Sequence, residues 1–287
     1  MADRTGIEWT DATWNPVTGC TEVSPGCDHC YAKTFAERWR GTPGHYFEHG
    51  FDVQLRPDKL DMPLRWKKPR RIFVNSMSDL FHDQVPDSYI ARVFAMMAWA
   101  PQHTFQVLTK RHARMRSLLN STAFQSAVSD AIVDYDNGQA VQVFWGADWP
   151  LKNVWLGVST ENQQWANIRI PALLDTPAAV RFISAEPLLG SISLMRWLNG
   201  GFGTVAPDLH WVIVGGESGP GARVMSPDWA RDLRDECVAA DVPFLFKQWG
   251  AWRPVNDKDT MQRLGKHAAG RELDGRTWDQ YPLLAAA

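Results

Sequence analysis

Short apolar runs alternate with helix-like stretches along most of this chain, and this alternation limits the folds open to it. Runs that are apolar at consecutive positions are typical of strands buried on both faces, as in a parallel sheet covered by helices. We therefore expect an α/β fold built as a full or partial (βα) barrel of parallel strands, with an open doubly wound sheet as the alternative. The expected strands are residues 14–17, 71–75, 104–108, 154–158, 180–183, 211–214 and 244–246.

The same alternation predicts how the chain is divided. Helices are expected at residues 31–40, 87–99, 111–119, 163–174 and 227–240, with Ser226 as the N-cap of the last one. The barrel is expected to occupy residues 1–250, interrupted by an insertion at about 121–150, where Asp134, Asp136, Asn137 and Gly138 break the rhythm. Residues 251–287 are expected to form a C-terminal appendage, either peripheral or a partly mobile tail.

Composition narrows the class of protein and its compartment. The hydrophobic fraction of 45% suits a globular core, and a net charge of −2 over 287 residues gives no overall sign of nucleic-acid binding. One basic segment, residues 65–71, is a candidate nucleic-acid face, with a solvated loop as the alternative. The N-terminal residues lack an apolar signal core, and the most apolar run, residues 89–100, contains Arg92 and is too short to span a bilayer. We expect a cytoplasmic protein with no membrane partner.

Three of the four cysteines lie close together near the N-terminus. Cys20, Cys27 and Cys30 have the spacing C-x6-C-x2-C, and a Pro-Gly turn lies between the first two. Thiols stay reduced in the cytosol, so this spacing indicates a metal site and not a disulfide scaffold. Structural zinc and most iron–sulfur clusters take four protein ligands, so three thiolates leave one metal position open. Cys237 lies in a helical pattern and is expected to be a buried, inert thiol.

Polar or glycine-rich groups follow nearly every expected strand. Because the carboxyl ends of parallel strands meet at one edge, these groups are expected on the face that carries the active site in such folds. The alternative for each segment taken alone is an ordinary solvated loop. The segments begin at Asn75, Thr109, Ser159, Ser184, Gly215 and Lys247.

A three-cysteine loop after the first strand of a (βα) barrel resembles the radical S-adenosylmethionine superfamily. The phrases at residues 14–31, 184–189, 215–219 and 247–250 look more closely like a phage-associated three-cysteine family of uncharacterised function, and this resemblance covers most of residues 5–250. In the superfamily, three cysteines bind a [4Fe–4S] cluster whose fourth iron is chelated by S-adenosylmethionine, and reductive cleavage yields a 5′-deoxyadenosyl radical. The superfamily's usual first spacing is C-x3-C, and its Gly-Gly-Glu motif usually follows the second strand, whereas here Gly-Gly-Glu follows the sixth.

The resemblance implies a role for each of the polar groups. Cys20, Cys27 and Cys30 are the expected cluster ligands, with structural zinc as the alternative. Glu186, Glu217 and Lys247 are the candidate catalytic residues in contact with substrate, unless they close the barrel mouth as ion pairs. The expected contacts to S-adenosylmethionine are Ser76, Ser78 and Asp79 at the methionine end, Ser159, Glu161 and Asn162 at the ribose, and Gly215 and Gly216 beside the adenine or methionine.

The resulting hypothesis is an iron–sulfur enzyme that cleaves S-adenosylmethionine to start radical chemistry on an unidentified substrate. Its expected partners are S-adenosylmethionine, an electron donor and, as one candidate substrate for modification or repair, nucleic acid. The alternative is a non-catalytic iron–sulfur or zinc protein, phage-associated like its look-alikes, that acts through a partner. A fourth cysteine or histidine ligand beside the three cysteines would favour that closed, structural site.

Overall fold

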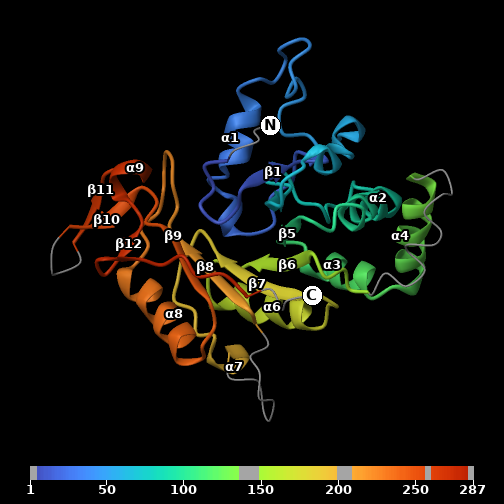
Figure 1. Cartoon of the computed structure of the whole chain (residues 1–287). Helices are drawn as coiled ribbons and strands as arrows, with labels where there is room; N and C mark the ends of the chain where they lie inside the picture. Colours follow the sequence, from blue (N-terminus) through green and yellow to red (C-terminus); the bar gives the residue numbers. More distant parts are fainter. Residues whose placement is uncertain (1–4, 136–148, 199–208, 256–259, 284–287) are drawn as a thin grey trace. The chain divides into compact units, whose positions relative to one another are not determined.

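The computed structural model describes residues 5–135, 149–198, 209–255 and 260–283 (Figure 1). These residues form two compact units, and each is described here by itself. The first unit comprises Met1–Val23, Tyr31–Leu156 and Asp175–Ala179, and the second comprises Ser24–Cys30, Gly157–Leu174 and Val180–Ala287.

The seven main strands are arranged in the order in which the chain forms them. They are β1 (Ala12–Trp14), β4 (Arg71–Val74), β5 (Thr104–Thr109), β6 (Val154–Ser159), β7 (Val180–Ala185), β8 (Trp211–Gly215) and β9 (Phe244–Gln248). Their order in the sheet is β1-β4-β5-β6-β7-β8-β9, and the β1–β4, β4–β5, β7–β8 and β8–β9 pairs are parallel. In a doubly wound sheet the order of the strands reverses part-way across the sheet. Here the order follows the chain from the first strand to the last, so the fold is α/β with the strand order of a partial (βα) barrel.

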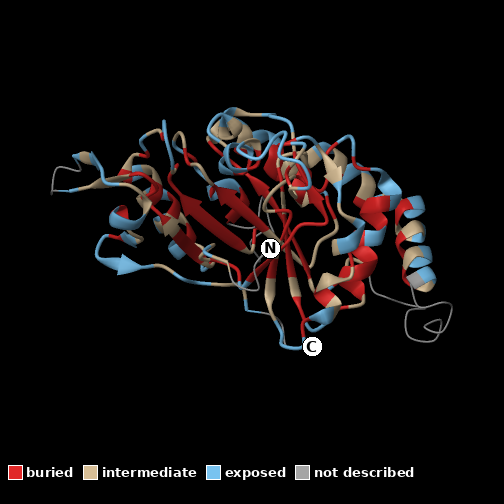
Figure 2. Cartoon of the chain, turned by 90° about the horizontal axis from the view of Figure 1, so that it is seen from above, coloured by how far each residue is buried: buried red, intermediate tan, exposed pale blue. Residues whose placement is uncertain are grey.

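The first unit builds its core on β1, β4 and β5. Ala12 lies opposite Ile72, which in turn lies opposite Phe105, and all three are fully buried. Figure 2 shows that most strands of the chain are largely buried, whereas the exposed residues lie mainly on loops and on helix faces. The helices of this unit are α1 (Tyr31–Glu37), α2 (Asp87–Ala98), α3 (His112–Leu119) and α4 (Thr122–Tyr135), and α2 packs against α4.

The beginning of the chain differs from the expected strand at residues 14–17. The strand β1 ends at Trp14, and Pro16 separates it from β2 (Val17–Thr18), which pairs antiparallel with β3 (Gln54–Leu55). Proline has no backbone N–H to donate, so it ends the parallel ladder at this point. The 3₁₀ helices η2 (Pro57–Lys59) and η3 (Met62–Arg65) follow β3. The expected insertion at about 121–150 holds α4, and its residues 136–148 lie outside the described ones.

The second unit surrounds β7, β8 and β9. Its helices are η1 (Pro25–Cys27), α6 (Gln163–Leu174), α7 (Met195–Leu198) and α8 (Pro227–Ala239), and α8 packs against β8 and β9 (Figure 1). Cys237 on α8 is fully buried, and burial raises the pKa of its thiol well above the usual value. Ser226 occupies the N-cap position of α8 as expected, but its side chain makes no capping hydrogen bond to the described residues.

The described part of residues 251–287 belongs to the second unit and packs against β9. It forms β10 (Trp252–Pro254), β11 (Met261–Arg263), α9 (Lys266–Ala269), β12 (Glu272–Leu273) and β13 (Arg276–Thr277). The backbone N–H of Phe246 donates to Trp278 O at 3.0 Å, and Leu245 and Asp279 form an antiparallel bridge. Among the described residues, no helix is long and apolar enough to cross a membrane.

Candidate functional site

The segment after β4 in the first unit contains three of the residues expected to contact S-adenosylmethionine. Asp79 is 6% exposed, and its carboxylate accepts hydrogen bonds from the Thr109 hydroxyl at 2.7 and 2.9 Å. It also accepts from the backbone N–H groups of Phe81 and Lys110, both at 3.0 Å. Asp79 thereby ties the end of β4 to the end of β5, and its lone pairs are largely used inside the unit.

The two serines of this segment are also held from within the first unit. The Ser78 hydroxyl donates to Val17 O at 2.8 Å. The Ser76 hydroxyl lies 3.2 Å from Asn15 Nδ2 and 3.3 Å from Asn15 Oδ1. Each serine therefore anchors the segment to the chain that follows β1.

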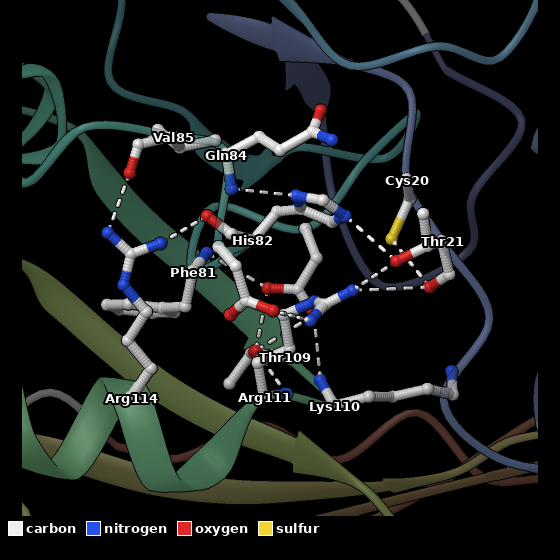
Figure 3. Close-up of polar contacts among 12 residues, drawn as sticks. Cys20, Thr21, Phe81, His82, Gln84, Val85, Thr109, Lys110, Arg111 and Arg114 are labelled. Carbon is white, nitrogen blue, oxygen red and sulfur yellow. Dashed lines mark hydrogen bonds and ion pairs between the residues drawn. The ribbon is translucent and has the colours of Figure 1, made fainter.

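A polar cluster lies beside Cys20 in the same unit (Figure 3). The Thr21 hydroxyl lies 2.9 Å from His82 Nε2 and accepts a 2.7 Å hydrogen bond from Arg111. His82 Nδ1 accepts from the backbone N–H of Gln84 at 3.1 Å, an arrangement that suits the tautomer with the ring proton on Nε2. Burial, together with the positive charge of Arg111, lowers the pKa of His82 from its usual value.

The Ser24–Cys30 loop, which carries Cys27 and Cys30, is fixed to the second unit through Glu161. The Ser24 hydroxyl donates to Glu161 Oε1 at 2.6 Å. A Cβ atom on Gly26 would lie 2.4 Å from the same oxygen, so the absence of a side chain lets the loop backbone pack against this carboxylate. Within the loop, the backbone N–H of Cys30 donates to Cys27 O at 3.2 Å and closes a tight turn.

Glu161 forms an ion pair with Arg169 in which both side chains are 0% exposed, at 2.9 Å. The Arg169 guanidinium also donates to Ser159 O at 2.8 Å and lies over the Trp165 ring at 4.1 Å. A buried charge is retained only when it is paired and hydrogen-bonded. Asn162 Oδ1 accepts from the backbone N–H of Trp165 at 3.2 Å and so caps the start of α6.

A second arginine, Arg223, also contacts the cysteine loop. Arg223 donates to Glu217 at 2.6 and 2.9 Å, and its remaining N–H groups reach Pro25 O at 2.8 Å and Asp28 at 3.0 Å. Burial alone would raise the pKa of Glu217, but the hydrogen bonds and charge of Arg223 outweigh burial and lower it. Glu217 is therefore the anionic partner that holds Arg223 in place while Arg223 donates hydrogen bonds to the cysteine loop.

Glu186 and Lys247 form an ion pair of 2.6 Å, with side chains 19% and 13% exposed. A Cβ on Gly215 would lie 3.3 Å from the Glu186 carboxyl carbon, and a Cβ on Gly216 would lie 2.0 Å from Trp249 O. Gly216 is thus required by a close crossing of two backbone segments at the ends of β8 and β9. Glu186 and Lys247 are thus paired with each other, and their contact with a substrate stays a prediction.

The three cysteines of the loop are half-buried thiols. Cys20 belongs to the first unit, whereas Cys27 and Cys30 belong to the second. Within the described parts of the chain, no group of three or more histidine, cysteine, aspartate or glutamate side chains is placed so that it could hold a metal ion. The metal site therefore stays a prediction.

Sequence reasoning missed the residues that organise these groups. Arg169 and Arg223 lie 8 and 6 residues along the chain from their glutamates, and their positions in α6 and in the loop after β8 gave no spacing signal. Asn75 is the first residue of an expected polar segment, but sequence reasoning gave it no role. It has a positive φ of 63° and a buried side chain, and the Asn-Ser pair directly after an apolar run was the available signal for a turn.

Comparison with protein families gives one match. The family model described as "Protein of unknown function (DUF5131)" matches residues 4–282. The chain belongs to this family. Comparison with curated proteins and with solved structures finds no match.

Proposed function

We propose that this protein is an iron–sulfur enzyme of the radical S-adenosylmethionine type, similar to the phage-associated three-cysteine family. The observation that carries the proposal is a loop with three half-buried cysteines that follows the first strand of a parallel sheet in barrel order. Cys20, Cys27 and Cys30 would hold a [4Fe–4S] cluster, with S-adenosylmethionine at the open iron. When bound, these groups would supply hydrogen-atom abstraction from an unreactive C–H bond of the substrate.

The donor set is compatible with such a cluster. Three partly exposed thiols are chemically suited to be cluster ligands, whereas the fully buried Cys237, with its raised pKa, is a poor fourth ligand. Ser24, Glu161 and Arg223 hold the part of the loop that carries Cys27 and Cys30. A fixed loop limits the rearrangement needed when a metal binds.

In this proposal, several of the side chains expected to contact S-adenosylmethionine hold the loops in place and do not bind the ligand themselves. Asp79, Glu161 and Ser78 are engaged by partners inside their own units. A ligand that displaced such a partner would gain little, because one hydrogen bond replaces another. We therefore assign these side chains, with Ser76, Ser159 and Asn162, to the support of the loops. Glu186, Glu217 and Lys247 are ion-paired in the second unit as well, and substrate contact by these three residues stays part of the proposal.

Anaerobic purification followed by iron and sulfide analysis tests the proposal. With dithionite and S-adenosylmethionine, the wild-type protein should form 5′-deoxyadenosine, and Cys27→Ala should abolish both cluster and product. Cys237→Ala is the matched control, since that thiol is buried on α8, and should retain both. Tightly bound zinc without iron would instead support the non-catalytic alternative, in which the protein acts through a partner.

Nucleic acid is the candidate substrate that the basic segment supports. Arg65 pairs with Asp61 at 2.6 Å and Arg71 with Asp11 at 3.1 Å, while Lys67 and Lys68 are exposed. Binding to a single-stranded oligonucleotide should weaken as salt rises, and it should weaken further when Lys67 and Lys68 are replaced by Gln. Binding that does not change with salt or with this substitution would remove nucleic acid from the proposal.

A further inference from the structure

Asn75 stands out among the polar side chains that follow β4. It is 2% exposed, and neither its Oδ1 nor its Nδ2 has a hydrogen-bond partner among the residues that the structure describes. Exchanging the two amide atoms would not change this, because both lack a partner. In the same segment, Ser76, Ser78 and Asp79 all have partners. The amide of Asn75 is therefore the side-chain group in this segment whose hydrogen-bonding capacity the described residues leave unused.

The backbone at Asn75 also indicates more than a turn residue. Its φ of 63° lies in the left-handed region, where glycine is the least strained residue and asparagine is tolerated. Asn75 N donates to Trp14 O at 2.8 Å, and Asn75 O accepts from Ser78 N at 3.2 Å, so the backbone makes the turn without help from the side chain. Glycine would make this turn and would leave no buried polar atoms unpaired. Selection of asparagine is thus unexplained by the turn alone.

The neighbouring strand carries a second buried amide. Gln106 on β5 is 0% exposed and lies opposite Phe73, two residues before Asn75. Its Nε2 donates to Trp9 O at 3.2 Å, and its Oε1 has no partner among the described residues. Phe73 is half-buried, and its ring centroid lies 4.5 Å from that of Trp9. The first unit therefore contains unpaired amide atoms at Asn75 and Gln106 and, on the strand that leads to Asn75, an aromatic pair.

We propose that the Asn75 amide binds the hydrogen-bonding edge of a nucleobase. An asparagine side chain offers a donor and an acceptor side by side, and it forms bidentate pairs with bases that present the complementary two atoms. Aromatic side chains near such a group favour a flat, stacked ligand over a peptide amide. The base could belong to a nucleotide substrate or to an adenosyl cofactor, and both share this edge. The proposal does not rest on the radical chemistry, because this binding requires no cluster.

Calorimetric titration of metal-free protein tests it with adenosine, guanosine, cytidine, uridine and S-adenosylmethionine as separate probes. At least one of the five probes should bind, and Asn75→Gly should weaken that binding about 10- to 100-fold. The left-handed backbone suits glycine, so the urea midpoint should stay the same or rise. Asp241→Gly is the matched control, since Asp241 has a φ of 54° at an exposed position after α8, and it should leave binding unchanged.

Each outcome of this titration is decisive. Loss of S-adenosylmethionine binding in Asn75→Gly, with free nucleosides bound poorly, would support base recognition and assign the base to the cofactor. Failure of the wild-type protein to bind any of the five probes would overturn the proposal, as would equal affinity in Asn75→Gly. A lowered urea midpoint in Asn75→Gly would show that the amide has a structural role and would also overturn it. None of these results depends on whether 5′-deoxyadenosine is formed.

Discussion

The two units stabilise their buried carboxylates in different ways. In the first unit, Asp79 accepts hydrogen bonds from a hydroxyl and two backbone N–H groups. In the second, Glu161 is paired with the guanidinium of Arg169, and both side chains are 0% exposed. Neutral donors can be lost one at a time, whereas loss of a buried counter-ion leaves a whole charge without compensation. The second unit should therefore be the more sensitive to single substitutions.

The largest effect is expected when the buried pair of the second unit is broken. Arg169→Met should lower the free energy of unfolding by about 3–5 kcal/mol, because Glu161 would be left as an unpaired buried charge. Urea denaturation followed by circular dichroism measures this. Combining it with Glu161→Gln should recover most of the loss, and Arg116→Met, which removes an exposed ion pair with Asp175, should cost less than about 1 kcal/mol. A small loss of unfolding free energy in Arg169→Met would contradict the expectation that the second unit is the more sensitive to single substitutions.

Replacing the carboxylate of the first unit should have a smaller effect. In Asp79→Asn, whichever oxygen becomes NH₂ would face a backbone N–H, either that of Phe81 or that of Lys110. We expect a loss of about 1.5–3 kcal/mol in the same denaturation experiment, the range for hydrogen bonds to a charged group. Asp83→Asn, at a carboxylate that is 77% exposed, is the control and should change stability little. If Asp79→Asn lowered the free energy of unfolding as much as Arg169→Met does, the two units would not differ in their sensitivity to loss of a carboxylate's partner.

Gly26 tests whether Glu161 also positions the cysteine loop. A methyl group there would meet Glu161 Oε1 at 2.4 Å, and that side chain is pinned by Arg169 and Ser24. Gly26→Ala should cost about 1–3 kcal/mol through overpacking and should increase the rate at which iodoacetamide labels Cys27 and Cys30. Gly6→Ala, where a Cβ meets nothing within 4 Å among the described residues, is the control. Unchanged labelling would show that the Glu161–Arg169 ion pair does not position the cysteine loop.

The smallest expected effect is a pH dependence in the first unit. The pKa of His82 is lowered in the folded protein, so the unfolded chain takes up a proton first as the pH falls. Stability should be full above the unfolded value of 6.5 and should be lost as the pH falls through the lower folded pKa. His103, whose pKa is also lowered, contributes a slope of the same sign. The difference between wild type and His82→Asn in denaturation at several pH values isolates His82, and equal slopes would contradict it.

The sequence predicts the strand and helix pattern because each apolar run is buried along its own length. Residues such as Val74 and Ile213 are fully buried whatever their distant partners are. The partners of the polar loops could not be predicted in the same way. Asp79 finds Thr109 30 residues away, and Ser24 finds Glu161 137 residues away, so these contacts exist only once the strands have been ordered. Sequence reasoning therefore assigned these side chains to a ligand and could not predict the internal partners that the structure gives to several of them.

The bridge between Leu245 and Asp279 has a consequence for how this protein behaves at high concentration. The strand β9 is the last in the sheet order, and its outer backbone groups would otherwise form an open template for another chain. Residues 278–280 occupy those groups through Phe244 and Phe246. Shortened variants that end before residue 278 would expose an apolar edge of three buried residues, Phe-Leu-Phe, and would be prone to strand-to-strand aggregation during expression. The C-terminal segment is thus expected to reduce aggregation by covering the edge of β9.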